Sequence, residues 1–133
     1  MSKILKLILM KSIFSFLLLL IISFTAYSQT SGAFLSLESD SLNYGIIKKG
    51  SNGEREITIK NTGDKPLIIS DCKGTCGCTI PKCPTIVILP GSKSKITITY
   101  DTFRVGKFNK TVSVRSNAIN HITYIKVTGE VIL

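Results

Sequence analysis

Hydrophobic and polar residues alternate along most of the chain beyond residue 40. Isoleucines take every second position in the middle of segments 54–61 and 93–101, and charged or hydroxyl side chains lie between them. Valine and isoleucine repeat the alternation in segments 109–116 and 121–132. A period of two carried by β-branched residues is typical of antiparallel strands with one buried face. We therefore expect strands rather than helices in this part of the chain.

Clusters of glycine, proline, asparagine and aspartate separate these segments. Turn-forming residues at such short intervals predict about seven or eight strands in one domain. The expected strands span 34–38, 42–47, 54–61, 66–70, 86–89, 93–101, 109–116 and 121–132. This pattern predicts an all-β fold, an immunoglobulin-like antiparallel β-sandwich. The chain lacks tryptophan and its cysteines lie close together, so it does not have the signature of an antibody domain.

The first 28 residues have the parts of a secretory signal peptide. Lys3, Lys6 and Lys11 precede or adjoin an apolar run over 13–24, and small residues follow in 26–28. That run of 12 residues is shorter than the roughly 20 that a membrane-spanning helix needs. We therefore expect cleavage after the signal and export to the periplasm, the cell surface or the medium.

An uncleaved membrane anchor is the alternative use of the same segment. Met10 opens a second signal of the same kind, so translation from Met10 is an alternative start. After cleavage behind Ser28, the chain would not span a membrane. Its first mature residue would be Gln29.

The mature chain is expected to form one small basic domain. Removing the 28 signal residues from the 133-residue chain leaves 105, which is enough for one modest core. We expect residues 29–41 to form an N-terminal extension with a first short strand, and residues 42–133 to form the sandwich. Three of the 17 basic residues leave with the signal and none of the eight acidic ones do, so the net charge falls from +9 to +6.

The positive charge is spread along the chain rather than gathered in a stripe. Lys60, Lys95 and Lys126 are examples at strand positions that the alternation places outward. Lysines there keep a protein soluble and protect sheet edges from pairing, and they attract anionic envelope polymers weakly. No basic stripe interleaved with aromatic residues marks a nucleic-acid groove. We therefore expect no nucleic-acid partner.

The sequence contains no catalytic constellation. It has one histidine and eight acidic residues, with no nucleophile elbow and no glycine-rich phosphate loop. We therefore expect a protein that is not an enzyme and that needs no cofactor. Its expected partner is a protein or another component of the cell envelope.

Four cysteines lie within twelve residues, at Cys72, Cys76, Cys78 and Cys83. In an oxidising compartment, an even number of clustered cysteines favours disulfide bonds, and four cysteines allow three pairings. A bridge from Cys76 to Cys78 would close a small, strained ring, for which Gly77 would supply unusual backbone angles. Strained, exposed disulfides are the ones most easily reduced.

Metal binding and redox chemistry are the alternatives to structural disulfides. Thiolates suit Cu(I) and zinc, but gaps of three, one and four residues between the cysteines fit a zinc site poorly. The Cys76–Cys78 chelate fits Cu(I) better, although no methionine or histidine lies nearby. Lys73 and Lys82 create a positive field that lowers thiol pKa values, which favours redox activity. We expect these two lysines and the cysteine loop to form the partner surface.

Several motifs together resemble the DUF1573 family, a set of exported bacterial domains of unknown function that are frequent in Bacteroidetes. The resemblance covers residues 42–132, and Cys76-Gly77-Cys78-Thr79 is its most specific part. The other motifs are Tyr44-Gly45-Ile46-Ile47 with Gly50, the segment 59–67, Pro90-Gly91, Gly106-Lys107-Phe108 and the segment 127–131. The resemblance implies an immunoglobulin-like fold related to ASPM–SPD-2–Hydin and major-sperm-protein domains. It implies no mechanism.

The resemblance also bears on the cysteine pairing. The family pattern carries Cys76 and Cys78, whereas Cys72 and Cys83 are additions, with Cys83 at a position where an aromatic residue is common. The resemblance therefore implies the pairs Cys72–Cys83 and Cys76–Cys78. Spacing alone leaves the two crossed pairings open. An outer bridge would close a loop of 12 residues and stabilise the fold by roughly 3 kcal/mol.

Overall fold

The structure, a computed structural model, describes residues 2–22 and 31–133. They belong to two compact units, one within Met1–Thr30 and one spanning Ser31–Leu133. In the first unit, α1 (Ser2–Ile22) carries three lysines in its first half and exposes large hydrophobic side chains along its length. Within the described residues, no helix has both the length and the apolar character to cross a membrane. The expected cleavage site after Ser28 lies outside the described residues.

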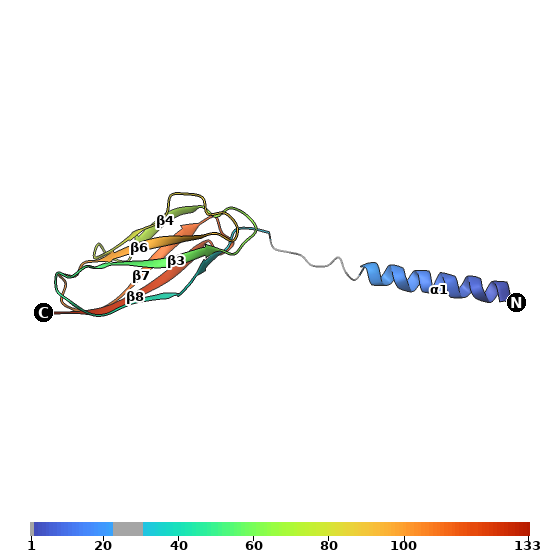
Figure 1. Cartoon of the computed structure of the whole chain (residues 1–133), viewed down its shortest axis with the longest axis horizontal. Coiled ribbons are helices and arrows are strands. Elements are labelled where there is room, and N and C mark those ends of the chain that lie inside the picture. The colour runs from blue at the N-terminus through green and yellow to red at the C-terminus, as the bar shows by residue number, and fades with distance from the viewer. Residues whose placement is uncertain (1, 23–30) are drawn as a thin grey trace. The chain divides into compact units, whose positions relative to one another are not determined.

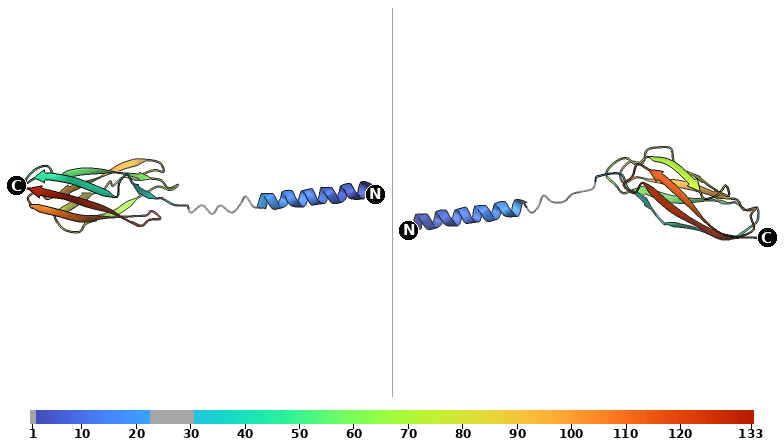
Figure 2. Two further views of the ribbon diagram at one scale, coloured as in Figure 1. Left: turned by 90° about the horizontal axis from the view of Figure 1, so that it is seen from below. Right: turned by 180° about the vertical axis from the view of Figure 1, so that it is seen from behind.

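The second unit consists of two four-stranded sheets packed face to face (Figures 1 and 2). The first sheet has the strand order β1–β3–β6–β5, and the second has the order β2–β8–β7–β4. The strands are β1 (Leu35–Leu37), β2 (Ser41–Lys48), β3 (Glu54–Asn61), β4 (Ile69–Gly74), β5 (Thr79–Lys82), β6 (Lys93–Tyr100), β7 (Gly106–Ser116) and β8 (Ile122–Ile132). The expected immunoglobulin-like β-sandwich is therefore present.

The buried side chains follow the alternation in the sequence. Ile57 and Ile59 of β3 and Ile96 and Ile98 of β6 all lie in the core between the sheets. Burying each aliphatic side chain of this size stabilises the fold by roughly 1.5–3 kcal/mol. The second sheet contributes the matching inward residues Val112, Val114, Ile125, Val127 and Val131.

One strand pair departs from the antiparallel arrangement that we expected. β2 pairs with β8 in parallel, with a shift in register between Asn43 and Ile46. The period-two pattern shows which face of a strand is buried, but it is the same for parallel and antiparallel neighbours. The alternation of β2 therefore could not reveal the direction of its partner.

The expected strand 86–89 is wrong as a regular strand, and the expected strand 66–70 coincides with β4 only in its last two residues. Leu67 and Ile88 form an isolated bridge, in which they exchange two backbone hydrogen bonds of 2.9 Å. The strands in this region are instead β4, which begins at Ile69 opposite Ser116, and β5, which lies between the two expected segments. Both contain cysteine, glycine or proline and lack the alternation, so their extended form depends on pairing with β7 and β6.

An aromatic cluster connects the sheets at one end of the sandwich. Tyr44 of β2 packs edge-on against Tyr100 and Phe108, at ring-centroid distances of 6.2 and 5.6 Å. Its hydroxyl lies 2.8 Å from the carbonyl oxygen of Gly53 and 2.9 Å from that of Ile98, and donates to them. Burial raises the pKa of Tyr44 to about 12. This side chain therefore ties the second sheet to the backbone of the first.

Candidate functional site

The cysteines lie where the chain passes from one sheet to the other. β4 is the last strand of the second sheet, β5 is the last strand of the first, and residues 75–78 connect them. The two strands contact each other across the open side of the sandwich. We refer to β4, residues 75–78, β5 and Cys83 together as the cysteine edge. It is the part of the fold on which the chemistry expected from the sequence depends.

Cys72 and Cys83 form a disulfide bond between the two sheets. Cys72 lies on β4 opposite Val114, on the inward face of the second sheet, and Cys83 directly follows β5. Their Cα atoms are 6.3 Å apart, within the usual range for a disulfide. The bond closes the open edge of the sandwich and restricts the unfolded chain over 11 residues of sequence separation.

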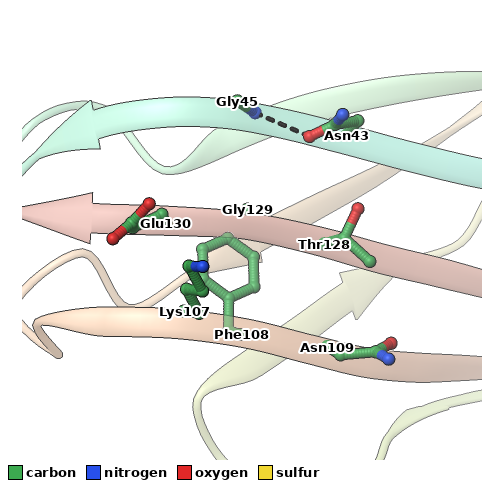
Figure 3. Close-up of a pocket in the computed structure, with 8 residues that line it drawn as sticks. All are labelled: Asn43, Gly45, Lys107, Phe108, Asn109, Thr128, Gly129 and Glu130. Atoms are coloured by element: carbon green, nitrogen blue, oxygen red, sulfur yellow. Dashed lines mark hydrogen bonds between the residues drawn. The ribbon is translucent and has the colours of Figure 1, made fainter.

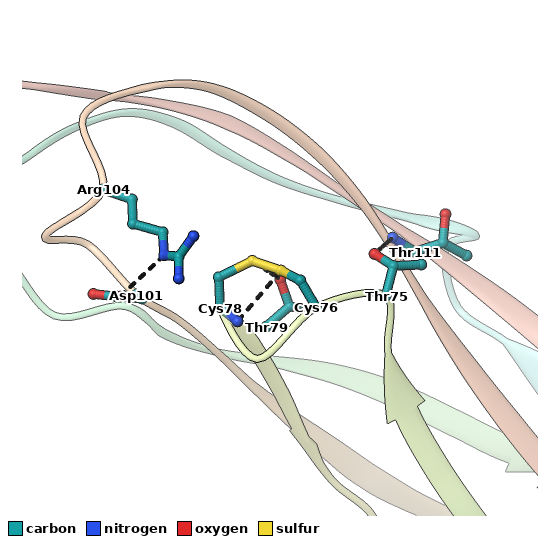
Figure 4. The surroundings of a disulfide bond; sticks show 7 residues. All are labelled: Thr75, Cys76, Cys78, Thr79, Asp101, Arg104 and Thr111. Carbon is teal, nitrogen blue, oxygen red and sulfur yellow. Dashed lines mark hydrogen bonds and ion pairs between the residues drawn. A yellow bond between two sulfur atoms is a disulfide. The ribbon is translucent and has the colours of Figure 1, made fainter.

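Cys76 and Cys78 form a second disulfide in the connecting loop, with Cα atoms 5.2 Å apart (Figure 4). Cys78 is only 2% exposed, whereas Cys76 is half-buried. The amide of Cys78 donates a hydrogen bond of 3.3 Å to Sγ of Cys76. The loop is fixed by two backbone bonds, from Thr79 N to Cys76 O and from Asp101 N to Cys78 O. These two pairs are the ones that the family resemblance implied.

Gly74, rather than Gly77, is the glycine that the loop requires. Gly77 does not have a positive φ, and a Cβ atom there would meet nothing within 4 Å. The expectation that Gly77 supplies unusual backbone angles is therefore wrong. At Gly74, a Cβ atom would collide with the carbonyl oxygen of Thr79. Glycine at position 74 lets the start of β5 approach the end of β4.

The two lysines expected beside the cysteines lie on opposite sides of the sandwich. Lys73 alternates with the inward Cys72 and therefore faces outward from the second sheet, where it pairs with Asp71 at 3.4 Å. Lys82 lies opposite Thr97 on the outer face of the first sheet. The structure therefore does not bring Lys73 and Lys82 together into one surface.

Two other cationic residues lie in segments whose backbone is hydrogen-bonded to the loop, through Asp101 and Thr111. Arg104 pairs with Asp101 at 3.3 Å, and Asp101 is the residue whose amide binds the carbonyl of Cys78 (Figure 4). Lys110 lies on β7 between Phe108 and Val112, both of which are buried, so it occupies an inward position. Lys110 was not singled out in the sequence analysis. The alternation of buried residues over 108–114 places residue 110 on the inward face, so a lysine at that position could have been noticed.

The sulfur atoms of the cysteine edge are all used in disulfides. Within residues 2–22 and 31–133, no three side chains of histidine, cysteine, aspartate or glutamate gather as a metal site would require. Cu(I) binding at Cys76 and Cys78 would therefore need reduction of their bond first. The four cysteines, as the structure pairs them, are suited to disulfide chemistry rather than to metal binding.

A shallow hollow of about 510 Å³ lies elsewhere, over β2, β8 and β7 (Figure 3). Its lining includes the directly opposed pair Lys107 and Glu130 and two asparagines, Asn43 and Asn109. It contains one acidic and one basic side chain, with no nucleophile and base in hydrogen-bond contact. Its lining does not amount to a catalytic arrangement.

Known structures share the fold. A protein of unknown function from Porphyromonas gingivalis W83 superposes with a TM-score of 0.67 at 21% identity over 80% of this chain. This chain spans about half (50%) of the length of that protein. The human CEP192 ASH/PapD-like domain 7 gives a TM-score of 0.65 at 11% identity, with 81% of this chain and 92% of the domain covered.

A protease also contains a similar region. The Vibrio cholerae VesB protease gives a TM-score of 0.57 at 10% identity, over 74% of this chain but only 32% of VesB. Identities this low show a common fold and nothing about activity. No curated protein matches the sequence.

The family assignment comes from the sequence itself. The family model described as "Protein of unknown function (DUF1573)" matches residues 35–131. This range begins at β1, ends within β8 and includes the whole cysteine edge. The chain therefore belongs to the DUF1573 family.

Proposed function

We propose that this protein is an exported, non-enzymatic immunoglobulin-like module of the bacterial cell envelope. Residues 1–28 act as a signal peptide and are removed, residues 29–41 form an extension, and residues 42–133 form the module. The mature protein resides in the periplasm, on the cell surface or outside the cell. Its role is to bind a protein or another envelope component.

The pair of disulfides in one loop-and-edge segment is the observation that carries this proposal. Disulfides persist in oxidising compartments and are rare in the cytosol. A basic, apolar N-terminal segment without acidic residues supports the same address. A domain with a core as small as this one gains stability from such cross-links.

A binding role agrees with the surface of the domain better than catalysis does. The hollow over β2, β8 and β7 lacks a nucleophile–base pair, and the cysteine edge is an exposed margin at which both sheets end. Sheet edges and loops at the end of a sandwich are common docking sites for partners. Of the structurally similar proteins, the CEP192 domain is named ASH/PapD-like. VesB is a protease, but the region similar to this chain makes up only about a third (32%) of it.

Fractionation of cells that make the protein tests the proposal. We expect the protein in the envelope or the medium, with Gln29 as its N-terminal residue. A matched control replaces the apolar signal residues Leu17 and Leu18 with lysine, which should retain the protein in the cytosol. Recovery of the unaltered, full-length chain in the cytosol would contradict export.

The second candidate function is a thiol-based site at Cys76 and Cys78. It is favoured by the unequal burial of these two cysteines and by the hydrogen bond from Cys78 N to Cys76 Sγ. Binding of Cu(I) is one form of this function and requires the reduced pair. Cu(I) binding is tested by adding Cu(I) to protein in which this bond has been reduced and measuring the bound metal by mass. If no metal is taken up, Cu(I) binding at this site is excluded.

A further inference from the structure

The two cysteines of the Cys76–Cys78 disulfide differ in exposure. Cys78 is 2% exposed and belongs to the hydrophobic core cluster. Cys76 is half-buried and lies between the exposed residues Thr75 and Gly77. A thiolate from another molecule can therefore approach Sγ of Cys76 but not Sγ of Cys78. Exchange reactions at this bond must begin at Cys76, because the attacked sulfur has to be reached in line with the S–S bond.

The backbone is already arranged to stabilise a thiolate on Cys76. The amide N–H of Cys78 donates to Sγ of Cys76 at 3.3 Å. A hydrogen bond to the charged form of a group favours that form. Residues 75–78 hold this amide beside the sulfur atom. A hydrogen bond from Asp101 N to Cys78 O fixes them to a residue outside the ring that the Cys76–Cys78 disulfide closes.

Lys110 is the cation nearest to Cys76 along the strand register. In the β4–β7 pair, Lys73 lies opposite Ser113 and Gly74 opposite Val112. The pairing continues by one more hydrogen bond, from Thr75 N to Thr111 O at 3.0 Å. Extending this register by one more residue along each chain pairs Cys76 with Lys110.

Lys110 also faces the correct side of the sheet and has no acidic partner. Its neighbours two positions away, Phe108 and Val112, are buried, so its side chain leaves the inward face. The three ion pairs of the described residues do not include it. Arg104, by contrast, is paired with Asp101. A positive charge that is not paired with an acid and lies next to a cysteine favours the thiolate form of that cysteine.

The inner disulfide also contributes less to stability than the outer one. It joins residues two apart in sequence, whereas Cys72 and Cys83 are 11 apart. The stabilisation that a disulfide gives by restricting the unfolded chain grows with loop length. Breaking the inner bond therefore leaves the sandwich closed by the outer bond and folded.

We propose that Cys76–Cys78 is a reversible redox site that exchanges with a protein dithiol, and that Lys110 is the positioning residue that stabilises the Cys76 thiolate. A thiolate of the partner attacks Sγ of Cys76, an S–S bond forms between the proteins, and the Cys76–Cys78 bond breaks. Cys78 leaves as a thiolate and takes a proton from water.

The second thiol of the partner then completes the exchange. As a thiolate, it attacks the partner's own sulfur in the mixed disulfide, so that an S–S bond forms within the partner and Cys76 leaves as the thiolate that the Cys78 amide and Lys110 stabilise. The partner becomes a disulfide, and this protein gains two electrons and one proton, which is bound to Cys78. The reverse sequence reoxidises the site. This inference rests on the second candidate function, the thiol-based site, and does not depend on the proposed binding role.

Graded reduction of the folded, oxidised protein is the first test. The protein is equilibrated with increasing dithiothreitol, free thiols are alkylated, and the modified cysteines are identified by peptide mass. We expect Cys76 and Cys78 to become alkylated at a dithiol concentration at least tenfold below that needed for Cys72 and Cys83. Simultaneous reduction of both bonds, or earlier reduction of the outer one, overturns the proposal.

Variants with a single free thiol test the role of Lys110. In the Cys78→Ser variant, the rate at which Cys76 reacts with an aromatic disulfide reagent is measured from pH 5 to 10. Adding Lys110→Gln should raise the midpoint of this profile and slow the reaction at pH 7 about three- to tenfold. The matched control is Lys126→Gln, because Lys126 lies opposite Thr111 on β8 and points to the outer face.

The outcomes separate an electrostatic role from a structural one. Lys110→Arg should restore the rate and the midpoint, because it restores the positive charge. Equal profiles for Lys110→Gln and Lys126→Gln overturn the role of Lys110. If Cys78→Ser does not fold, as judged by circular dichroism, the same comparison is made by the dithiol concentration that half-reduces the inner bond in the otherwise unaltered protein.

Discussion

Cys72 and Cys83 connect the last strand of one sheet to the end of the last strand of the other, with their Cα atoms 6.3 Å apart. No hydrogen-bonded strand pairing joins β4 to β5, which belong to different sheets. The bond therefore closes an edge that backbone pairing leaves open.

Removing the outer disulfide should destabilise the fold measurably. We expect Cys72→Ser/Cys83→Ser to lower the free energy of unfolding by roughly 3 kcal/mol, because the unfolded chain is no longer restricted over this loop. Urea denaturation measures the change. Cys76→Ser/Cys78→Ser is the matched comparison and should cost about half as much, because its loop is much shorter. A larger loss from the inner pair would contradict this account of the outer bond.

Substituting the two glycines of the cysteine edge should change the stability of the fold by different amounts. Gly74→Ala places a Cβ atom against the carbonyl oxygen of Thr79, so we expect a loss of about 1–3 kcal/mol from overpacking. Gly77→Ala meets no atom within 4 Å and has no positive φ to oppose it, so it should be neutral. Thermal unfolding of both variants tests the prediction, which fails if Gly77→Ala is the more damaging.

The hydroxyl of Tyr44 should matter for stability and for its dependence on pH. Tyr44→Phe leaves the carbonyl oxygens of Gly53 and Ile98 without this donor, at a cost of about 1–2 kcal/mol near neutral pH. Burial raises the pKa of Tyr44 to about 12, so the folded state holds the phenolic proton more tightly than the unfolded state. The protonated hydroxyl of Tyr44 therefore makes its full contribution to the free energy of unfolding below pH 10, and this contribution is lost as the pH rises from 10 to 12.

Denaturation of the unaltered protein and of Tyr44→Phe across pH 8–12 checks this sign. The difference in unfolding free energy between them should shrink above pH 10, because only the unaltered protein loses this contribution. A difference that stays constant or grows above pH 10 would show that the hydroxyl is not held in its protonated form by the fold.

Asn61 should be the most sensitive polar side chain of the sandwich. It is fully buried, donates to the carbonyl oxygens of Lys65 and Ile88, and accepts from the amides of Gly63 and Phe34. Asn61→Ala leaves these buried groups unpaired and should cost at least about 2 kcal/mol. Asn52→Ala, at an exposed turn where the side chain accepts one bond, is the control and should cost under about 1 kcal/mol. Similar losses for both would contradict the prediction.

Sequence periodicity revealed the sandwich because β3, β6, β7 and β8 bury one face each and carry β-branched residues in alternation. It failed at β4 and β5, which contain a cysteine, a glycine and a proline in place of alternating β-branched residues, and whose strand form depends on pairing with distant segments. The parallel pairing of β2 with β8 was equally hidden, because alternation carries no information about direction.

The candidate site was partly visible in the sequence. The tight cysteine cluster pointed to the cysteine edge, and the family resemblance implied the pairing. Closeness in sequence was a poor guide to the surrounding charge, because Lys73 and Lys82 face outward from different sheets. Lys110 enters the proposed site only by extension of the register of β4 and β7, which the fold and not the sequence determines.

Disulfide mapping of the native protein tests the central claim most directly. Tryptic cleavage after Lys73 and Lys82 separates the cysteines into peptides 61–73, 74–82 and 83–93. Without reduction, we predict that 61–73 is linked to 83–93, while 74–82 is released alone, two hydrogens lighter than its dithiol form. A single product that joins all three peptides, as either crossed pairing would give, or peptides with free thiols throughout would contradict the account.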